Sequence, residues 1–202
     1  MNGRFTDHLR RSLFGLAMLL AAATTVRAAD PAATVMLVAT PALSDPVYKG
    51  SVLVASPLGD GRFLGFIVNK PTRITLGQAF PEHGPSKKVA DPIFLGGPDQ
   101  ANKLFALVQR EQSPGNGSIR ILSDLFVVVA GDTVDQVIEQ DPEHARFLFG
   151  AVVWQPGELD SEIKRGAWYV EQPDTDVMMR KETRKLWEEL VQRRGGGRRG
   201  FI

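Results

Sequence analysis

Residues 51–69 read SVLVASPLGDGRFLGFIVN, and this stretch decides the fold. Two segments rich in β-branched and aromatic residues, 51–56 and 63–69, flank the turn-forming residues 57–62, which include two glycines. A short glycine-containing connection between two such segments predicts a β-hairpin. Strand pairing is therefore expected to be local in this part of the chain.

Outward from the hairpin, strand and helix candidates follow one another in irregular order. Residues 35–39 (VMLVA) form a continuous apolar run that is typical of a buried strand. We expect further strands at 92–95, 104–108, 125–130, 147–154 and 167–170, and helices at 75–80, from Asp132, at 157–165 and at 180–193. Thr75 and Asp132 are the expected caps of the first two helices. Because strict strand–helix–strand alternation is missing, we predict an α+β fold with a mixed, mostly antiparallel sheet.

The first 28 residues have the composition of a signal peptide. A basic start (Arg4, Arg10, Arg11) precedes residues 12–26, which are apolar or small. This run is shorter than the roughly 20 residues that span a bilayer, so no stable membrane span is expected. We place cleavage near Ala28 and expect an exported protein, periplasmic or secreted. A transit peptide and an uncleaved anchor are the alternative interpretations.

Composition limits the remaining chain to a few classes of protein. With 202 residues, of which 43% are hydrophobic and 23% are charged, we expect one globular domain over residues 29–194 and a flexible Arg/Gly tail over 195–202. Removing residues 1–28 leaves 20 basic and 22 acidic residues, so nucleic acid is not an expected partner. The absence of cysteine excludes thiol catalysis, thiolate metal sites and a lipid-bearing cysteine.

Two short motifs at strand ends are candidates for ligand binding. Asn69-Lys70-Pro71 leaves an apolar strand, and an amide and an ammonium at a strand end form either a turn or part of a ligand surface. Gly96-Gly97-Pro98 is not followed by the Lys-Ser or Lys-Thr of a phosphate loop, so we expect a tight turn with positive φ. No nucleotide or other cofactor is expected.

A third candidate lies on the helix at 157–165. Glu158 and Glu162 are one turn apart, so they form either an acid–base pair or a solvated face, and Trp154 nearby is expected in the core or at its rim. His83 and His144 lack metal-ligand spacing, and no metal site is expected. No Gly-x-Ser-x-Gly motif supports a serine hydrolase.

Four separated blocks of sequence resemble one known family. Residues 37–46 (LVATPALSDP), 65–71 (GFIVNKP), 92–98 (PIFLGGP) and 150–168, with WQPGEL and GAW, occur in the order found in the YqgE/AlgH family. The resemblance covers roughly residues 35–193. It implies an α+β fold whose mixed sheet curls into a pseudo-barrel with helices outside. The family has no established biochemical activity, and some members are described as candidate transcriptional regulators linked to alginate production.

The signal peptide departs from this family pattern, because typical members resemble cytoplasmic proteins. We therefore expect a non-catalytic binding or regulatory module that acts outside the cytoplasm on an unknown small molecule or protein. Asn69, Lys70, Gly96, Gly97 and Trp154 are its predicted ligand-binding residues. The alternatives are a small hydrolase that uses Glu158 or Glu162, and a transcriptional regulator if the signal is not used.

Overall fold

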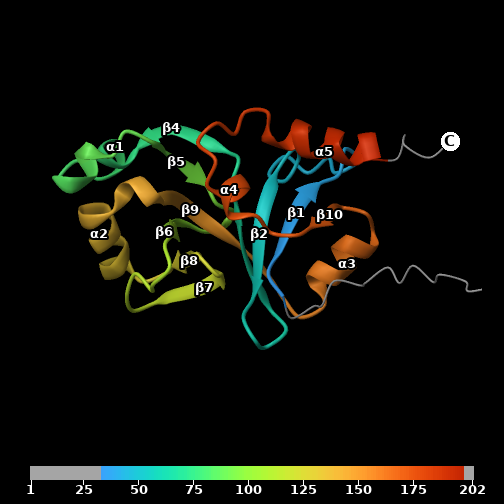
Figure 1. Ribbon diagram of the computed structural model, residues 1–202, viewed down its shortest axis with the longest axis horizontal. Helices are drawn as coiled ribbons and strands as arrows, with labels where there is room; N and C mark the ends of the chain where they lie inside the picture. Colours follow the sequence, from blue (N-terminus) through green and yellow to red (C-terminus); the bar gives the residue numbers. More distant parts are fainter. Residues whose placement is uncertain (1–32, 198–202) are drawn as a thin grey trace, which may run out of the picture.

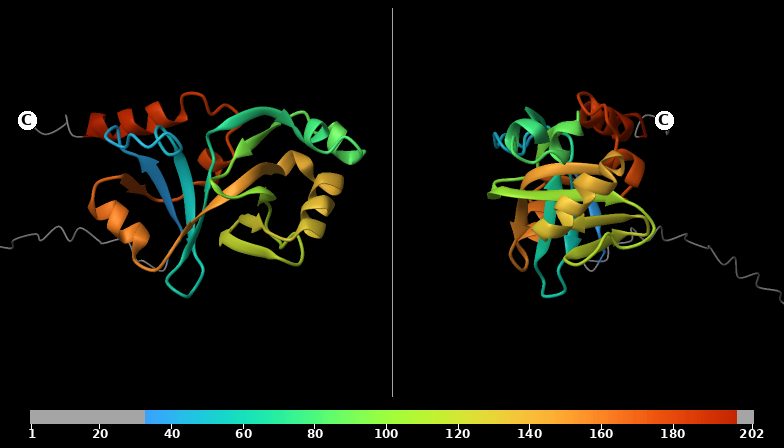
Figure 2. Two further views of the ribbon diagram at one scale, coloured as in Figure 1. Left: turned by 180° about the vertical axis from the view of Figure 1, so that it is seen from behind. Right: turned by 90° about the vertical axis from the view of Figure 1, so that its left-hand side faces the viewer.

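The computed structural model describes residues 33–197 and contains a ten-stranded sheet that curls into a half-barrel (Figure 1, Figure 2). The strand order is β10-β1-β2-β3-β9-β6-β8-β7, with β4 and β5 attached beside β9. Every pair is antiparallel except β5 with β9. The predicted α+β fold with a mixed, mostly antiparallel sheet is confirmed.

The strands are β1 (Val35–Ala39), β2 (Val52–Pro57), β3 (Phe63–Ile67), β4 (Pro71–Thr75), β5 (Pro92–Leu95), β6 (Asp99–Gln109), β7 (Ser118–Leu122), β8 (Leu125–Val128), β9 (Ala145–Trp154) and β10 (Trp168–Glu171). The α-helices are α1 (Leu76–Ala79), α2 (Gly131–Gln140), α3 (Glu158–Lys164), α4 (Thr175–Met178) and α5 (Leu186–Gly197). Two 3₁₀ turns, η1 (Pro85–Lys88) and η2 (Pro142–His144), complete the described elements. The hairpin at residues 51–69 is present as β2 and β3, and the register of this pair begins at Pro57↔Phe63.

Strand β9 joins the two halves of the sheet. Its first part pairs with β6 and β5, and its last part pairs with β3. Between them Gly150 has φ 73°, a conformation that glycine adopts without strain. A Cβ on Gly97 would lie 2.1 Å from the Ala151 carbonyl oxygen, and one on Gly96 would lie 2.3 Å from the Gly150 oxygen. Glycine is therefore required at positions 96 and 97 because their backbone lies directly against the backbone of β9. The prediction of a positive φ at these two positions was wrong.

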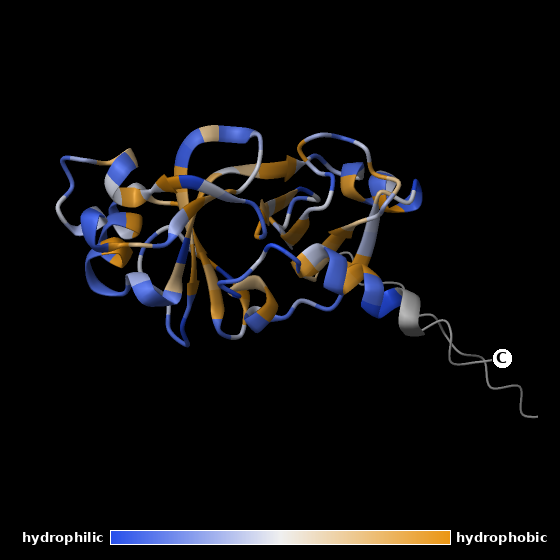
Figure 3. Cartoon of the chain, turned by 90° about the horizontal axis from the view of Figure 1, so that it is seen from above, coloured by the Kyte–Doolittle hydropathy of each residue, from blue (hydrophilic) through white to orange (hydrophobic). Residues whose placement is uncertain are grey.

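The concave inside of the half-barrel is an apolar core that both halves share. It joins Val54 and Phe66 to Phe105 and Val127, and the rings of Phe66 and Phe105 are 5.2 Å apart. Two further apolar clusters lie on the other face of the sheet, one against α2 and one against α3. Figure 3 shows hydrophobic residues along the strands and hydrophilic residues in the loops. Because both faces of the sheet are covered, its strands are apolar in runs rather than in alternation.

Arg146 of β9 fastens the segment around α4 to the sheet. The residue is only 6% exposed, and its Nη1 donates to the carbonyl oxygens of Val68, at 2.6 Å, and Met178. Its Nη2 donates to the carbonyl oxygen of Arg180, and the guanidinium lies 4.3 Å from the centroid of the Phe94 ring. Burial lowers the pKa of Arg146 to about 10, so the side chain stays charged at neutral pH. We call this arrangement the Arg146 clamp.

Two strands were not predicted. Pro71 was expected to end β3, but it is also the first residue of β4. Proline is tolerated there because β4 pairs with a single neighbour, β5, and Pro71 is its first position. No strand was expected between residues 108 and 125, although Ile119 and Ile121 alternate with polar residues, which is the signal of a half-buried strand, and β7 forms there.

Helix ends differ from the prediction at two places. Thr75 caps α1 in a capping box, as expected, but Ala130 rather than Asp132 is the N-cap of α2. The last helix begins at Leu186 instead of residue 180, and it continues through Gly197 instead of ending at residue 193. The signal peptide at 1–28 and the end of the predicted tail lie outside the described residues. No helix between residues 33 and 197 is long and apolar enough to cross a membrane.

Candidate functional site

The loop between β1 and β2 carries Tyr48 and is held by the predicted residues Asn69 and Lys70. The Asn69 side chain accepts from the Val52 amide at 2.8 Å and donates to the Gly50 carbonyl oxygen at 2.9 Å. Lys70 Nζ donates to the Val47 carbonyl oxygen, and burial lowers the pKa of Lys70. Both side chains therefore have internal partners, and their role in the structure is to position the loop.

Gly96 and Gly97 lead into Asp99, which reaches the end of β9. Asp99 Oδ2 accepts from the Val153 amide at 2.8 Å. Because the two glycines lie directly on the backbone of β9, they place this carboxylate beside the last residues of β9, next to Trp154. The predicted glycines thus act through their backbone, and their place in the fold explains the position of Asp99.

Trp154 is buried and shares its hydrogen-bond acceptor with Trp168. Glu162 Oε2 accepts from Trp154 Nε1 at 3.0 Å and from Trp168 Nε1 at 2.7 Å. Two indoles from different strands thus orient one half-buried carboxylate. This arrangement confirms the core position that was expected for Trp154.

Glu158 begins α3 and closes the turn that precedes it. Its Oε2 accepts from the Gln155 amide at 2.8 Å, and Gly157 between them has φ 79°. Glu158 and Glu162 lie one helical turn apart, as the sequence predicts, but each carboxylate bonds a different part of β9 and its turn. They form no hydrogen bond to each other among the described contacts.

Four carboxylates act electrostatically on the half-buried side chain of Tyr48, and we call these five residues the Tyr48 surface. They are Asp45, Asp99, Glu158 and Glu162. Asp45 Oδ1 accepts from the Tyr48 amide, and the Tyr48 ring meets the Trp168 ring edge-on at 5.8 Å. Burial raises the pKa of Tyr48 to about 12, and the four carboxylates add to this increase.

The charge of the Tyr48 surface is compensated only at Asp45, which interacts electrostatically with the half-buried Lys70. None of its carboxylates forms an ion pair with a basic side chain in residues 33–197. Each of the four carboxylates accepts hydrogen bonds through one oxygen. The other oxygen accepts none from residues 33–197. Sequence reasoning missed Asp45, Tyr48 and Asp99. Asp45 and Asp99 adjoin prolines in the family-like blocks, but only the fold brings them together.

The histidines have local structural partners. His83 Nδ1 lies 2.7 Å from Ser86 Oγ, and its Nε2 lies 3.9 Å from Glu139 Oε1. This trio has the residue types of a serine hydrolase, but Ser86 is fully buried and a substrate carbonyl cannot reach it. His144 pairs with Asp141 at 2.6 Å. Within residues 33–197, no group of three or more His, Asp or Glu residues is arranged to hold a metal ion.

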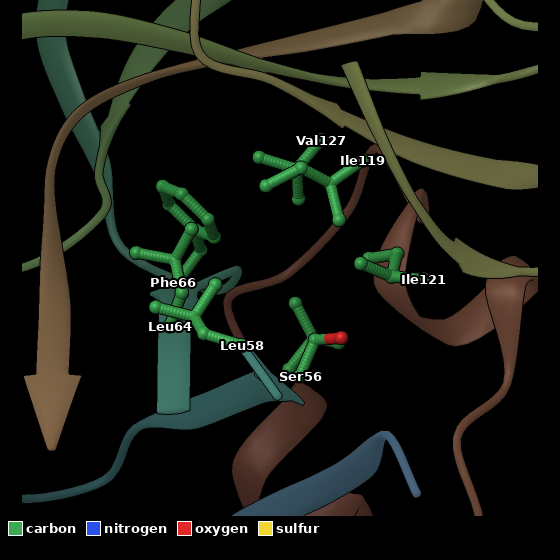
Figure 4. Close-up of a pocket in the computed structure, with 8 residues that line it drawn as sticks. Ser56, Leu58, Leu64, Phe66, Ile119, Ile121 and Val127 are labelled. Atoms are coloured by element: carbon green, nitrogen blue, oxygen red, sulfur yellow. The ribbon is translucent and has the colours of Figure 1, made fainter. Parts of the chain in front are cut away.

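Two hollows near the core are too small for a metabolite. The one in Figure 4 lies between the β2–β3 hairpin and β7, is lined by apolar side chains and Ser56, and measures about 10 Å³. A second hollow of about 60 Å³ adjoins Arg146. Ligand pockets are usually larger, roughly 300–1,000 Å³. These hollows mark seams between packed elements.

The family model described as AlgH-like matches residues 36–199 of this chain. A UPF0301 protein of Anaeromyxobacter dehalogenans (strain 2CP-C) is 31% identical over 177 residues, which cover 82% of this chain and 89% of that protein. A UPF0301 protein of Serratia proteamaculans (strain 568) is 26% identical over 168 residues, covering 79% and 89%.

Two solved structures share the fold. The solution structure of the AlgH protein of Pseudomonas aeruginosa has a TM-score of 0.64 at 20% identity and covers 83% of this chain and 88% of its own. A crystal structure of a Corynebacterium diphtheriae protein has a TM-score of 0.66 at 20% identity and covers 81% and 87%. At this identity the likeness concerns the arrangement of helices and strands alone.

Proposed function

This chain belongs to the AlgH-like family, and from that premise we propose that it is a non-catalytic binding module. Its partner is a positively charged segment that binds to the Tyr48 surface. The names of its curated relatives state no activity, so the proposal rests on the site itself. The observation that carries it is a set of four carboxylates that act on Tyr48, none of which forms an ion pair among the described residues and only one of which, Asp45, interacts with a basic side chain, Lys70.

Like charges that outnumber their basic neighbours raise the free energy of the folded protein, because each disfavours the ionised form of the others. A cationic partner would remove this repulsion. The carboxylates are also fixed before a partner arrives: Asp99 and Glu158 bond backbone amides, and Glu162 bonds two indoles. Less ordering is then needed on binding, which favours affinity.

The positions predicted from sequence support the same site. Asn69 and Lys70 hold the loop of Tyr48, Gly96 and Gly97 lead to Asp99, and Trp154 orients Glu162. Blocks of sequence that lie far apart in the chain therefore contribute to one face of the sheet, where Tyr48, Trp154 and Trp168 belong to the same apolar cluster. We propose that these residues shape the binding surface mainly by positioning its carboxylates.

The proposal is tested by calorimetric titration with an oligolysine peptide at low salt. In an Asp45→Asn/Asp99→Asn double variant, both amide side chains can still accept the backbone hydrogen bonds, so the fold is retained. The affinity should fall by about tenfold, because two attractive charges are lost.

The matched control removes the same charge elsewhere. Asp132 and Asp135 lie exposed on α2, in the other half of the molecule (Figure 1). An Asp132→Asn/Asp135→Asn variant should bind the peptide as the wild type does. An equal loss in both double variants would mean that net charge alone governs binding, and the proposed site would be rejected.

An activity assay distinguishes the proposed binding module from a hydrolase that uses Glu158. The binding module should show no turnover of ester, phosphate or glycoside substrates. Turnover by the wild type that disappears in Glu158→Gln would overturn the non-catalytic proposal.

We propose further that the protein acts outside the cytoplasm. The support is the signal-like composition of residues 1–28, which precede the family match that begins at residue 36. N-terminal sequencing of protein recovered from each cell fraction should find chains that begin after Ala28. Chains that retain Met1 and occur free in the cytoplasm would contradict export and would reopen a regulatory role inside the cell.

A further inference from the structure

A groove of about 650 Å³ lies between β10, α4 and α5. It is on the opposite face of β10 from the Tyr48 surface, because Trp168 joins the apolar cluster at α3 whereas Tyr169 joins the inner core. Its volume is within the range of roughly 300–1,000 Å³ that small-molecule pockets occupy. The groove therefore has the size of a ligand site.

Apolar side chains form the floor of the groove, and Tyr169, Glu171 and Gln172 line the groove beside them. Met36 of β1, Val177 of α4, and Leu190 and Val191 of α5 line it. All four belong to the inner core or pack against it, so a ligand on this floor would extend the core outward. Each methylene group buried there would contribute about 0.8 kcal/mol. An alkyl chain fits such a surface.

The rim of the groove carries two opposite charges that are not paired with each other or with another described side chain. Arg194 is satisfied, because it bonds the Glu171 carboxylate and the Val170 carbonyl oxygen. Asp174 uses Oδ1 to cap α4, and its second oxygen has no described hydrogen bond. Arg193 is exposed and forms no ion pair within residues 33–197.

We propose that this groove binds a zwitterionic amphiphile with a single alkyl chain. The chain lies on the floor formed by Val177, Leu190 and Val191. The anionic group of the head is recognised by Arg193, and its ammonium is recognised by Asp174. A ligand with both charges matches a rim that supplies one unpaired cation and one unpaired carboxylate. This inference is independent of the Tyr48 surface.

The test is calorimetric titration of the full chain with dodecylphosphocholine below its critical micelle concentration. The wild type should bind with saturation. Arg193→Gln should bind about tenfold more weakly, because a charged hydrogen bond is lost at an exposed position where folding is unaffected. Arg184→Gln removes an exposed arginine that pairs with Glu182 outside the groove, and it should bind as the wild type does.

Three further measurements distinguish the contribution of the ligand's head group from that of its alkyl chain. Val191→Thr, which keeps the shape of this partly buried side chain but places a hydroxyl group on the floor, should weaken binding, and phosphocholine without a chain should not bind. Dodecyl maltoside, which has the same chain and a neutral head, should bind at least about tenfold more weakly. Equal binding of both detergents, no effect of Arg193→Gln, or binding only to phosphatidylcholine vesicles would overturn the proposal.

Discussion

The Arg146 clamp and the Tyr48 surface both place charge where no oppositely charged side chain lies within ion-pair distance in the described chain. They use that charge differently. The Arg146 guanidinium is buried and donates to three carbonyl oxygens. The carboxylates around Tyr48 are exposed or half-buried, and each leaves one oxygen without a described partner.

This difference separates charge that holds the fold from charge that is available to a partner. A buried charge is tolerated when hydrogen bonds satisfy it, and removing it leaves those partners unsatisfied. A surface charge keeps its hydration, so collecting several of one sign costs stability without strengthening the core. The Arg146 clamp is therefore structural, and the Tyr48 surface has the properties of a binding site.

The largest expected effect is on stability, at the clamp. Arg146→Met would leave two buried carbonyl oxygens and one partly buried carbonyl oxygen without their donor, and it should lower the free energy of unfolding by about 3 kcal/mol. Arg120 is the matched control, because it also bonds carbonyl oxygens and stacks on a phenylalanine but is exposed. Arg120→Met should cost less than about 1 kcal/mol in urea denaturation. Equal costs would remove the distinction between buried and exposed charge.

Glu162 belongs to the Tyr48 surface but also bonds two buried indoles. Replacing it should therefore lower the stability by an intermediate amount. Glu162→Ala would leave the buried Trp154 and Trp168 indoles without an acceptor, at a cost of about 2 kcal/mol. Glu158→Ala removes one bond to the exposed Gln155 amide and should cost under about 1 kcal/mol. Thermal unfolding of both variants measures the difference. A larger loss in Glu158→Ala would contradict the account of α3.

The smallest expected effect is on the titration of Tyr48. Burial, assisted by Asp99 and the other carboxylates, raises its pKa from 10.0 to about 12. The stability that this shift contributes is complete below about pH 10 and is lost as the pH rises toward 12. Phenolate absorbance, with the Tyr48→Phe curve subtracted, reports this pKa. Asp99→Asn should lower it but leave it above 10, because burial is the larger cause. No change would mean that Asp99 does not act on Tyr48.

Local sequence signals predicted much of the fold. The glycine-containing turn of the hairpin, the apolar run of β1 and the Thr75 cap each depend on a few adjacent residues, and all three are present. The family-like blocks further predicted the curled sheet. Strand β4 and the start of α5 were missed, because tertiary pairing rather than local propensity determines them.

The candidate site was predicted only in part. Asn69, Gly97 and Trp154 do lie near it, but their bonds are internal, and a sequence does not show which partner a side chain will find. Tyr48 and Asp99 are 51 positions apart and meet only because β9 crosses between the halves of the sheet. No local periodicity carries that information, and the same holds for Arg146 and its three carbonyl oxygens.

Residue-resolved NMR titration with an oligolysine peptide tests the central claim most directly. The account predicts saturable shifts at the indole N–H signals of Trp154 and Trp168 and at the amides of Tyr48 and Asp99. Added salt should reverse these shifts, because it screens exposed charges. Signals near Arg146 should not move. Shifts spread evenly over all acidic residues, including those of α2, or no shifts around Tyr48, would contradict the account.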